Sequence, residues 1–599
     1  MPFLPLTKEE ALSRGWGGVD IACVTGDSYV DHPSFGIAII SRVLEDMGLR
    51  VGIIAQPQKD ADYSVFGKPR LGFFVTGGNI DSMVAHYTAA KRKRSDDPYT
   101  AGNKAGNRPD RAVTAYCRAI RRVYPDTAVI IGGLEASLRR FAHYDYWGDE
   151  VRPSVLLESG ADLLVFGMGE LQTRMIASRL SGGEHIRSVT DVRGTCYLCG
   201  GAELPKNSVS CPSYKKVRED KAAFARAHAL QAAEQDYITG RAIVQKHGED
   251  LYLIQNPPMH PLTTAELDAV YALPFMRMYH PSYEPLGGVK AIEEVEFSVT
   301  HNRGCFGGCA FCSIAFHQGK YVSVRSKESI LREAITMTGN PRFKGYIHDV
   351  GGATANFRRP SCKGQAVKGM CRGRRCLTPS PCPNLEVSHS EYLDILRELR
   401  RLPKVKKVFV RSGLRYDYIS LDPDPAFLRE LAEHHISGRL KVAPEHICGA
   451  VLDCMGKPRI QIYEKFAAAF RKATEKAGKK QYLVPYLMSS HPGTELKHAA
   501  ELASYLQKHG IRPEQVQDFY PTPGTDSTAM FHTGLDPYTM KPVYTAKSQE
   551  EKAKQRALLQ PSDPNNRALA HKAIREYGQK SSSQAKSKAA KRKNKRRGG

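Results

Sequence analysis

Three cysteines near the middle of the chain are spaced for metal chemistry. Cys305, Cys309 and Cys312 follow the pattern C-x3-C-x2-C in a glycine-rich loop, and Phe311 stands directly before the last of them. Thiolates are the usual ligands of iron–sulfur clusters. Three thiolates on a four-iron cluster leave one iron without a protein ligand, and an open metal position is typical of a reactive site. A zinc site, or a spacing that arose by chance, is the alternative.

This loop resembles the signature of the radical S-adenosylmethionine (SAM) enzymes, including the aromatic residue before the last cysteine. The resemblance implies a [4Fe–4S] cluster held by Cys305, Cys309 and Cys312. It also implies that the open iron binds SAM and that one electron then cleaves SAM to a 5′-deoxyadenosyl radical. Gly351 and Gly352, in a later segment, match the glycines with which this family approaches the SAM ammonium group.

The rest of the SAM site is less well marked in the sequence. Ala353 stands where the family carries an acid after the two glycines. Arg411 and Glu445 follow later strand candidates, where the resemblance implies contacts with SAM, and Arg411 is suited to pair with the SAM carboxylate. An ordinary place at the rim of the fold is the alternative for each. We identify no catalytic residue that acts on the substrate.

Other passages resemble one subgroup, the YgiQ family. They are residues 26–33, 349–356, 442–446 and 518–523, together with the basic C-terminus. This likeness covers nearly the whole chain and implies a bacterial radical SAM protein without an assigned substrate. It also implies an electron donor of the flavodoxin or ferredoxin type as a partner.

Two series of strands and helices must position these residues. In the first two hundred residues, apolar runs at 21–25, 51–55, 73–76, 128–131 and 163–166 end at or near glycines. Continuous apolar strands of this kind are typical of a doubly wound parallel sheet. We therefore predict an α/β protein with a Rossmann-like N-terminal sheet, whose ligands lie beyond the carboxyl ends of the strands. Glycines that only make tight turns are the alternative.

The second series predicts a complete or partial α/β barrel, with the three cysteines at the carboxyl end of its first strand. Its strand candidates are residues 295–300, 345–350, 407–411, 440–443, 481–488 and 516–520. A chain of 599 residues is too long for one core. We divide it into a Rossmann-like domain (1–200), a connecting segment (201–288), the barrel (289–540) with a cysteine-rich insertion (360–384), a helical extension (541–580) and a basic, disordered tail (581–599).

The cysteine-rich insertion is a second candidate metal site. Cys362, Cys371, Cys376 and Cys382 lie among basic and proline residues with few apolar ones. Four cysteines are enough to hold zinc or an auxiliary iron–sulfur cluster. The irregular spacing also suits cysteines that bind nothing.

The N-terminal domain resembles the cobalamin-binding domain that many radical SAM enzymes place before the barrel. Cobalamin domains that use histidine carry the motif D-x-H-x-x-G. The nearest match here is Asp31, His32 and Gly36, and both of its spacings differ. We therefore expect the fold without cobalamin.

Charge and composition limit the partners and the location. The formal net charge of +25 favours polyanions, and the basic tail suits weak contact with nucleic acid. No apolar run is long enough for a membrane helix, and the first residues do not form a secretory signal. We expect a soluble, cytoplasmic protein. Two rival functions remain: an iron–sulfur redox or sensor protein that does not cleave SAM, and a nucleic-acid-binding protein with structural zinc.

Overall fold

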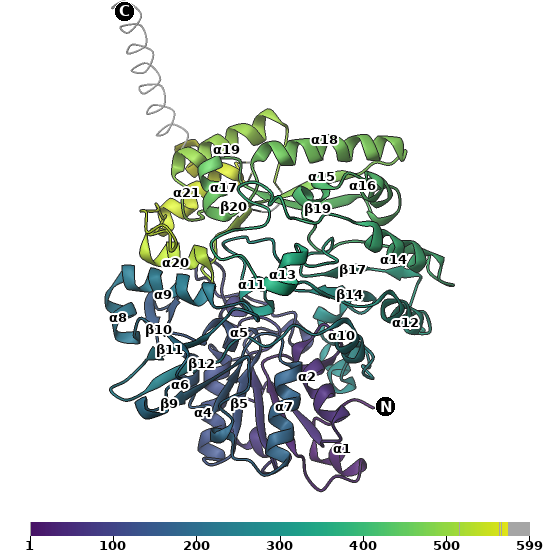
Figure 1. Ribbon diagram of the computed structural model, residues 1–599. Helices are drawn as coiled ribbons and strands as arrows, with labels where there is room; N and C mark the ends of the chain where they lie inside the picture. Colours follow the sequence, from purple (N-terminus) through teal and green to yellow (C-terminus); the bar gives the residue numbers. More distant parts are fainter. Residues whose placement is uncertain (1, 514–515, 562, 565, 573–599) are drawn as a thin grey trace, which may run out of the picture.

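The computed structural model describes residues 2–513, 516–561, 563–564 and 566–572. The N-terminal half of the chain forms the lower unit in Figure 1, and the C-terminal half forms the upper one. Within the described ranges, every helix is too short or too polar to cross a bilayer.

A large sheet forms the centre of the lower unit. Part of it is parallel, with the strand order β3-β1-β4-β5-β8. These strands are β1 (Ile21–Thr25), β3 (Val51–Ala55), β4 (Gly72–Thr76), β5 (Val129–Gly132) and β8 (Leu163–Val165). Successive residues of β1 face two different apolar cores, which explains why the strands read as unbroken apolar runs. The predicted doubly wound sheet is confirmed.

Helices cover both faces of this sheet. On one face, α2 (Gly36–Asp46) packs beside α7 (Glu170–Ser181), and on the other α4 (Ala112–Val123) packs beside α6 (Val155–Ser159). Helix α4 turns an apolar side toward the sheet and its basic residues outward, as its 3.6-residue periodicity requires. The crossovers therefore leave the carboxyl ends of the strands open along one edge.

The predicted connecting segment, residues 201–288, is partly absorbed into the same sheet. Beyond β8 the sheet continues through β9 (Thr195–Cys199), β12 (Tyr252–Gln255), β11 (Ala242–Lys246) and β10 (Ser208–Cys211). Strand β9 runs antiparallel to β8, and β12 and β11 each reverse direction again. The sheet therefore continues past residue 200, where the sequence predicted the domain to end. These outer strands are short and mix polar with apolar residues, so they carry no strong strand pattern.

The upper unit is a partial α/β barrel. Its first strand, β14 (Ser298–Arg303), pairs in parallel with β17 (Asp349–Gly352), and β16 (Tyr346–Ile347) pairs with β18 (Lys407–Val408). A backbone hydrogen bond from Val350 N to Phe409 O, 3.1 Å long, links the two pairs. A further parallel group completes the series with β19 (Arg439–Glu445), β20 (Tyr482–Ser489) and β21 (Val516–Asp518).

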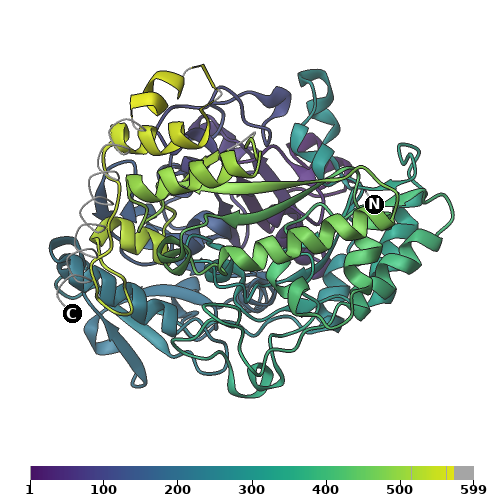
Figure 2. The same cartoon turned by 90° about the horizontal axis from the view of Figure 1, so that it is seen from above.

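Helices cover the outside of these strands. Figure 2 shows α18 (Ile460–Lys476) and α19 (Leu496–Lys508) lying across the strands when the molecule is seen from above. An apolar core between the strands and the helices α12 (Lys327–Thr338), α14 (Ser390–Arg401) and α18 stabilises the unit. The predicted α/β barrel is thus confirmed in its partial form.

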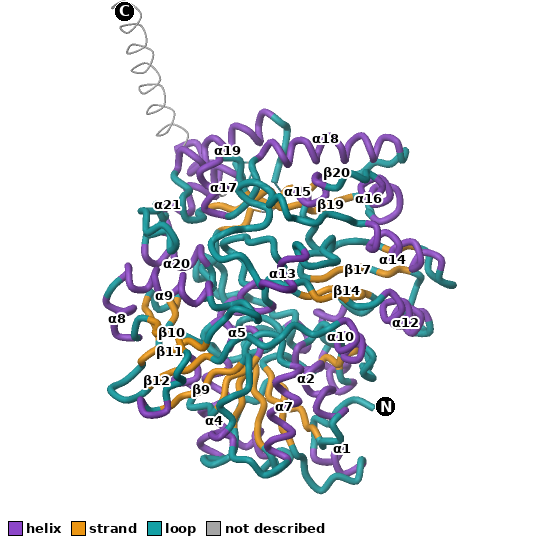
Figure 3. The backbone as a smooth tube through the Cα atoms, in the orientation of Figure 1, coloured by secondary structure: helices purple, strands orange, loops and turns teal. Residues whose placement is uncertain are grey.

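The insertion 360–384 separates β17 from α14. It is mostly loop, with one short helix, α13 (Lys363–Lys368), and Figure 3 places it near the contact between the two units. Helix α20 (Asp526–Thr533) packs on α9 (Lys221–Ala233) and joins the units at one side. Of the predicted helical extension, α21 (Gln549–Leu559) is formed. The basic tail 581–599 lies outside the described residues.

Candidate functional site

The loop with three cysteines starts where β14 ends. Gly304 has φ +82°, and a Cβ atom there would lie 1.9 Å from the carbonyl oxygen of Tyr321, so only glycine fits. The three cysteines are half-buried, and the loop runs into helix α11 (Ile314–Gln318). The structure therefore places the motif at the carboxyl end of the first barrel strand, as the sequence predicted.

Hydrogen-bond donors surround two of the three sulfurs. The Sγ atom of Cys305 accepts from Gly307 N at 3.3 Å and lies 3.2 Å from Thr354 Oγ1. The Sγ atom of Cys309 accepts from the guanidinium of Arg415 at 3.2 Å. Such donors stabilise sulfur in its thiolate form, which is the form that binds a metal.

Burial acts against the thiolate form when no metal is bound. It raises the pKa of Cys312 to about 12 and also raises the pKa of Cys305. Metal binding at this loop must therefore release protons. No group of three or more His, Cys, Asp or Glu side chains in the described residues is arranged to hold a metal ion.

Arg415 was missed by the sequence analysis. It is buried just before α15 (Tyr416–Leu421), and its guanidinium binds both carboxylate oxygens of Asp417, at 2.8 and 2.5 Å. Burial opposes the charge of Arg415, but Asp417 and Cys309 outweigh it and raise its pKa well above the ordinary value. The sequence signal that could have indicated this site is an arginine and an aspartate two residues apart, Arg415 and Asp417, after a barrel strand.

Gly351 and Gly352 lie at the end of β17, beside the motif strand. A Cβ atom on Gly351 would lie 2.0 Å from Ser412 Oγ, and one on Gly352 would lie 1.9 Å from Asn302 Oδ1. Both glycines are therefore needed for close packing, whatever else they contact. Thr354, two residues later, reaches Cys305 and connects this strand end to the cysteine loop.

The two other predicted SAM contacts, Arg411 and Glu445, lie in different surroundings. The side chain of Arg411 is 56% exposed and lies 4.0 Å from Glu294. Glu445 is buried with φ +67°, and its carboxylate lies 4.0 Å from Lys457 Nζ. Lys457 lies over the ring of Phe311 at 6.0 Å, so Glu445 stands near the cysteine loop. Burial raises the pKa of Glu445.

A cavity of about 530 Å³ opens beside the cysteine loop. Cys309 and Cys312 line one side of it. Residues of the cysteine-rich insertion line another side, among them Cys371 and three arginines, Arg372, Arg374 and Arg375. The cavity is large enough for a small organic molecule. Its lining is basic on balance, because Lys320 joins the three arginines and two aspartates, Asp526 and Asp536, oppose them.

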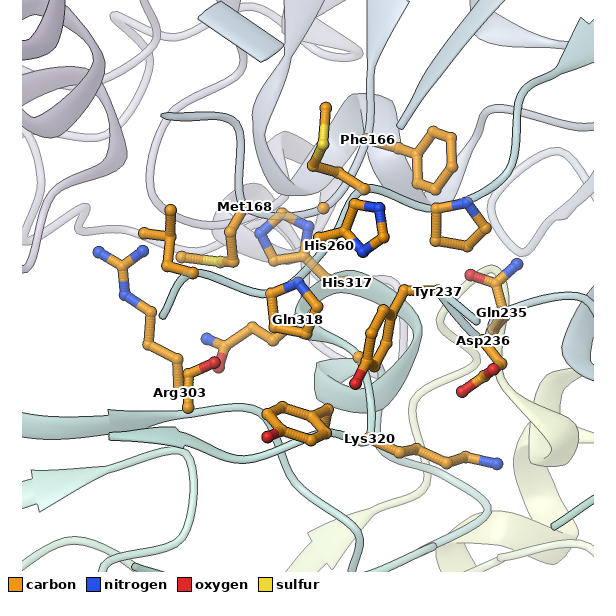
Figure 4. A pocket seen from close by; sticks show the side chains of 18 of the residues that line it. Phe166, Met168, Gln235, Asp236, Tyr237, His260, Arg303, His317, Gln318 and Lys320 are labelled. Carbon is orange, nitrogen blue, oxygen red and sulfur yellow. The ribbon is translucent and has the colours of Figure 1, made fainter. Parts of the chain in front are cut away.

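The carboxyl ends of the two sheets face each other. Arg303, at the end of β14, forms an ion pair with Glu170 at the start of α7. His317 of α11 lines a cavity of about 150 Å³ along the glycines that follow β5 and β8. It also lines a neighbouring cavity of about 90 Å³ with Tyr237 and His260, which Figure 4 shows. The ligand position predicted for the N-terminal sheet thus coincides with a cavity.

The residues nearest to a cobalamin motif are used for packing. The Asp31 carboxylate forms an ion pair with Arg42, and both side chains are buried. His32 is buried as well, and its Nδ1 accepts from Ser34 N at 3.0 Å. The expectation that cobalamin is absent stays a prediction.

Comparison with known proteins gives family matches at both ends of the chain. A family described as radical SAM N-terminal matches residues 3–298, and a domain of unknown function, DUF3362, matches residues 514–596. A UPF0313 protein from Clostridium perfringens is 53% identical over 579 residues, which are 96% of this chain and 87% of the relative. Another from Clostridium botulinum is 53% identical over 576 residues, 96% and 90% of the two chains.

Two solved structures are also similar. The radical SAM methyltransferase TsrM from Kitasatospora setae, with cobalamin and a [4Fe-4S] cluster bound, is 13% identical with a TM-score of 0.48, over 84% of this chain and 74% of that one. The cobalamin-dependent SAM radical enzyme OxsB, with aqua-cobalamin bound, is 11% identical with a TM-score of 0.43, over 84% and 54%.

Proposed function

This chain belongs to the UPF0313 (YgiQ-type) family of the radical SAM superfamily, and we propose that it cleaves SAM reductively. In this proposal Cys305, Cys309 and Cys312 hold one [4Fe–4S] cluster, and SAM binds at its open iron. The observation that carries the proposal is the geometry of the cysteine loop: three half-buried thiols follow the first barrel strand, and donors point at two of the sulfurs.

The bound cluster would supply one electron to break a C–S bond of SAM, giving methionine and a 5′-deoxyadenosyl radical that takes a hydrogen atom from the substrate. The protein holds and shields this chemistry. Arg415 keeps a positive charge beside Cys309, and Asp417 fixes its orientation. A cation and a hydrogen bond at a cluster sulfur both tune the reduction potential.

The residues around the loop suggest how SAM is oriented. Gly351 and Gly352 bring the end of β17 next to β14, so their backbone is available to the methionine part of SAM. Glu445 is buried, and its partner Lys457 lies over the ring of Phe311; we propose that Glu445 meets the adenosine part of SAM. No step of the reaction is assigned to a catalytic residue.

The basic cavity favours an anionic substrate. Arg372, Arg374 and Arg375 line it together with the two cysteines of the loop; Arg372 and Arg375 also pair with Glu234 and Asp526. Guanidinium groups bind carboxylates and phosphates through paired hydrogen bonds. We therefore propose a substrate with a carboxylate or phosphate group. A flavodoxin- or ferredoxin-type protein is the proposed electron donor, and the basic tail is proposed to contact nucleic acid weakly.

The proposal is tested by anaerobic reconstitution of the full chain with iron and sulfide, followed by dithionite and SAM. The expected product is 5′-deoxyadenosine, measured by mass spectrometry. The triple variant Cys305→Ala, Cys309→Ala, Cys312→Ala should form none, whereas Cys448→Ser, outside the loop, should match the wild type. A protein that holds its cluster but forms no 5′-deoxyadenosine would be a redox or sensor protein. Colourless protein with stoichiometric zinc would support the nucleic-acid-binding alternative.

A further inference from the structure

The four cysteines of the insertion lie around one small cavity. Cys362, Cys371, Cys376 and Cys382 all line a space of about 50 Å³. They come from positions up to twenty residues apart with irregular spacing, and the sequence left open whether they bind a metal or bind nothing. Their convergence is produced by the fold of the loop.

The loop is held in this shape from both ends. Glu386 N donates to Ser361 O at 2.9 Å and closes its base, and Cys382 N donates to Cys376 O at 2.9 Å inside it. Arg375 forms an ion pair with Asp526 of α20 at 3.2 Å. The positions of the cysteines are therefore set by contacts with the rest of the protein.

The loop has almost no apolar core of its own. Among the described residues 360–384, Leu377 is the one apolar side chain that is buried. It packs against Phe306 and Phe357 beneath the loop. The loop therefore gains little stability from apolar burial, and a metal cross-link would add to the polar contacts that hold it.

The surroundings favour a negatively charged group. Lys320, Arg374 and Arg375 line the same cavity, and none of the described residues that line it is a carboxylate. The charge is thus complementary to a group held by four thiolates.

We propose that Cys362, Cys371, Cys376 and Cys382 hold an auxiliary [4Fe–4S] cluster. A zinc ion would require the four sulfurs about 2.3 Å from one point. These four thiols instead line the walls of one cavity, which suits a group larger than a single ion. Four thiolates also complete the ligand set of a four-iron cluster, so this site has no open iron.

The proposed cluster borders the basic cavity beside the cysteine loop. Phe306 and Gly308 of that loop line the smaller cavity, and Cys371 lines the larger one together with Cys309 and Cys312. The two sets of cysteines are therefore neighbours, but the two proposed clusters share no ligand. The auxiliary site can exist whether or not the chain cleaves SAM.

Iron analysis of the anaerobically reconstituted full chain tests the proposal. The wild type is expected to hold about eight irons and eight sulfides, as two [4Fe–4S] clusters require. The double variant Cys376→Ala, Cys382→Ala and the variant without all four insertion cysteines should each retain about half of the iron. The variant without Cys305, Cys309 and Cys312 should also retain half, with a different Mössbauer and electron paramagnetic resonance (EPR) signal. Cys448→Ser is the matched control.

The wild-type count decides the question even if a variant fails to fold. About four irons in a fully reconstituted wild type would overturn the proposal, and so would unchanged iron in the insertion variants. One zinc per chain that disappears with the insertion cysteines would show a zinc site instead. Failure of SAM cleavage with eight irons present would contradict the proposed function alone.

Discussion

The guanidinium of Arg415 donates a hydrogen bond to the Sγ atom of Cys309 over 3.2 Å. The same group is held from behind by Asp417, with contacts of 2.8 and 2.5 Å to its carboxylate. Because Arg415 is buried, its charge acts on the sulfur through a weakly screening medium. We therefore expect Arg415 to position Cys309 in the cysteine loop.

Replacing Arg415 by glutamine should make the cluster harder to reduce. The change removes the positive charge next to Cys309 and leaves Asp417 unpaired. We expect a more negative reduction potential and SAM cleavage that is slower by about 10- to 100-fold, a range typical of groups that orient metal ligands. An EPR-monitored redox titration measures the potential, and Arg411→Gln is the matched control because that side chain is 56% exposed and pairs with Glu294. An unchanged potential would show that Arg415 is only structural.

Gly304→Ala should disturb the cysteine loop. The residue has φ +82°, and the new methyl group would lie 1.9 Å from a backbone oxygen that cannot move alone. The cost is at least about 2 kcal/mol of strain and repulsion. Iron content after reconstitution should fall, while Gly413→Ala, where no atom lies within 4 Å, should keep it. Equal iron in the two variants would contradict the packing described for this loop.

Asp526→Asn should loosen the insertion and the contact between the units. Burial favours the neutral acid, but His228 at 2.8 Å, Arg375 at 3.2 Å and Tyr538 at 2.8 Å outweigh it and hold the pKa of Asp526 far below its ordinary value. Removing a charge from such a group costs about 3 kcal/mol. We expect faster proteolytic cleavage within residues 360–384. An unchanged cleavage rate would argue that other contacts hold the loop.

His491 should contribute to loss of stability in acid. Burial lowers its pKa to about 3, so the folded protein keeps the ring neutral where the unfolded chain, with a pKa of about 6.5, takes up a proton. More protons then bind to the unfolded state as the pH falls from 7 to 5, and the folded state loses about 2 kcal/mol. Denaturant unfolding at both pH values measures this loss.

His491→Gln is the variant that isolates this contribution. Glutamine can still bond to Ser527, which lies 2.7 Å from Nε2, but it does not titrate. The difference in stability between pH 7 and pH 5 should therefore shrink relative to the wild type. The same difference in both proteins would mean that His491 is not neutral in the fold.

The sequence predicted the strands that are buried on both faces. The runs 21–25 and 51–55 coincide with β1 and β3, because each residue of such a strand contacts one of two cores and must be apolar. Strands β10 and β11 were not predicted, because they lie at and near the edge of the sheet and mix residue types. Unbroken apolar runs identify the central strands in the sequence, and the outer strands lack such runs.

The sequence predicted only those parts of the candidate site whose residues are close together in the chain. Cys305, Cys309 and Cys312 are close in sequence, so their common loop was predictable. The contact of Arg415 with Cys309 joins residues more than a hundred positions apart, and it depends on how the segment after β18 turns. Arg411 occupies the expected strand end, but its side chain points outward. Long-range contacts of this kind are set by tertiary packing.

We propose that three thiolates leave one iron open to SAM. Electron–nuclear double resonance on the reduced full chain, with SAM labelled in its amino nitrogen and carboxylate, probes that iron. We expect the EPR spectrum to change when SAM is added and the labels to couple to the cluster. A reduced cluster whose spectrum ignores SAM and shows no coupling would contradict the proposal.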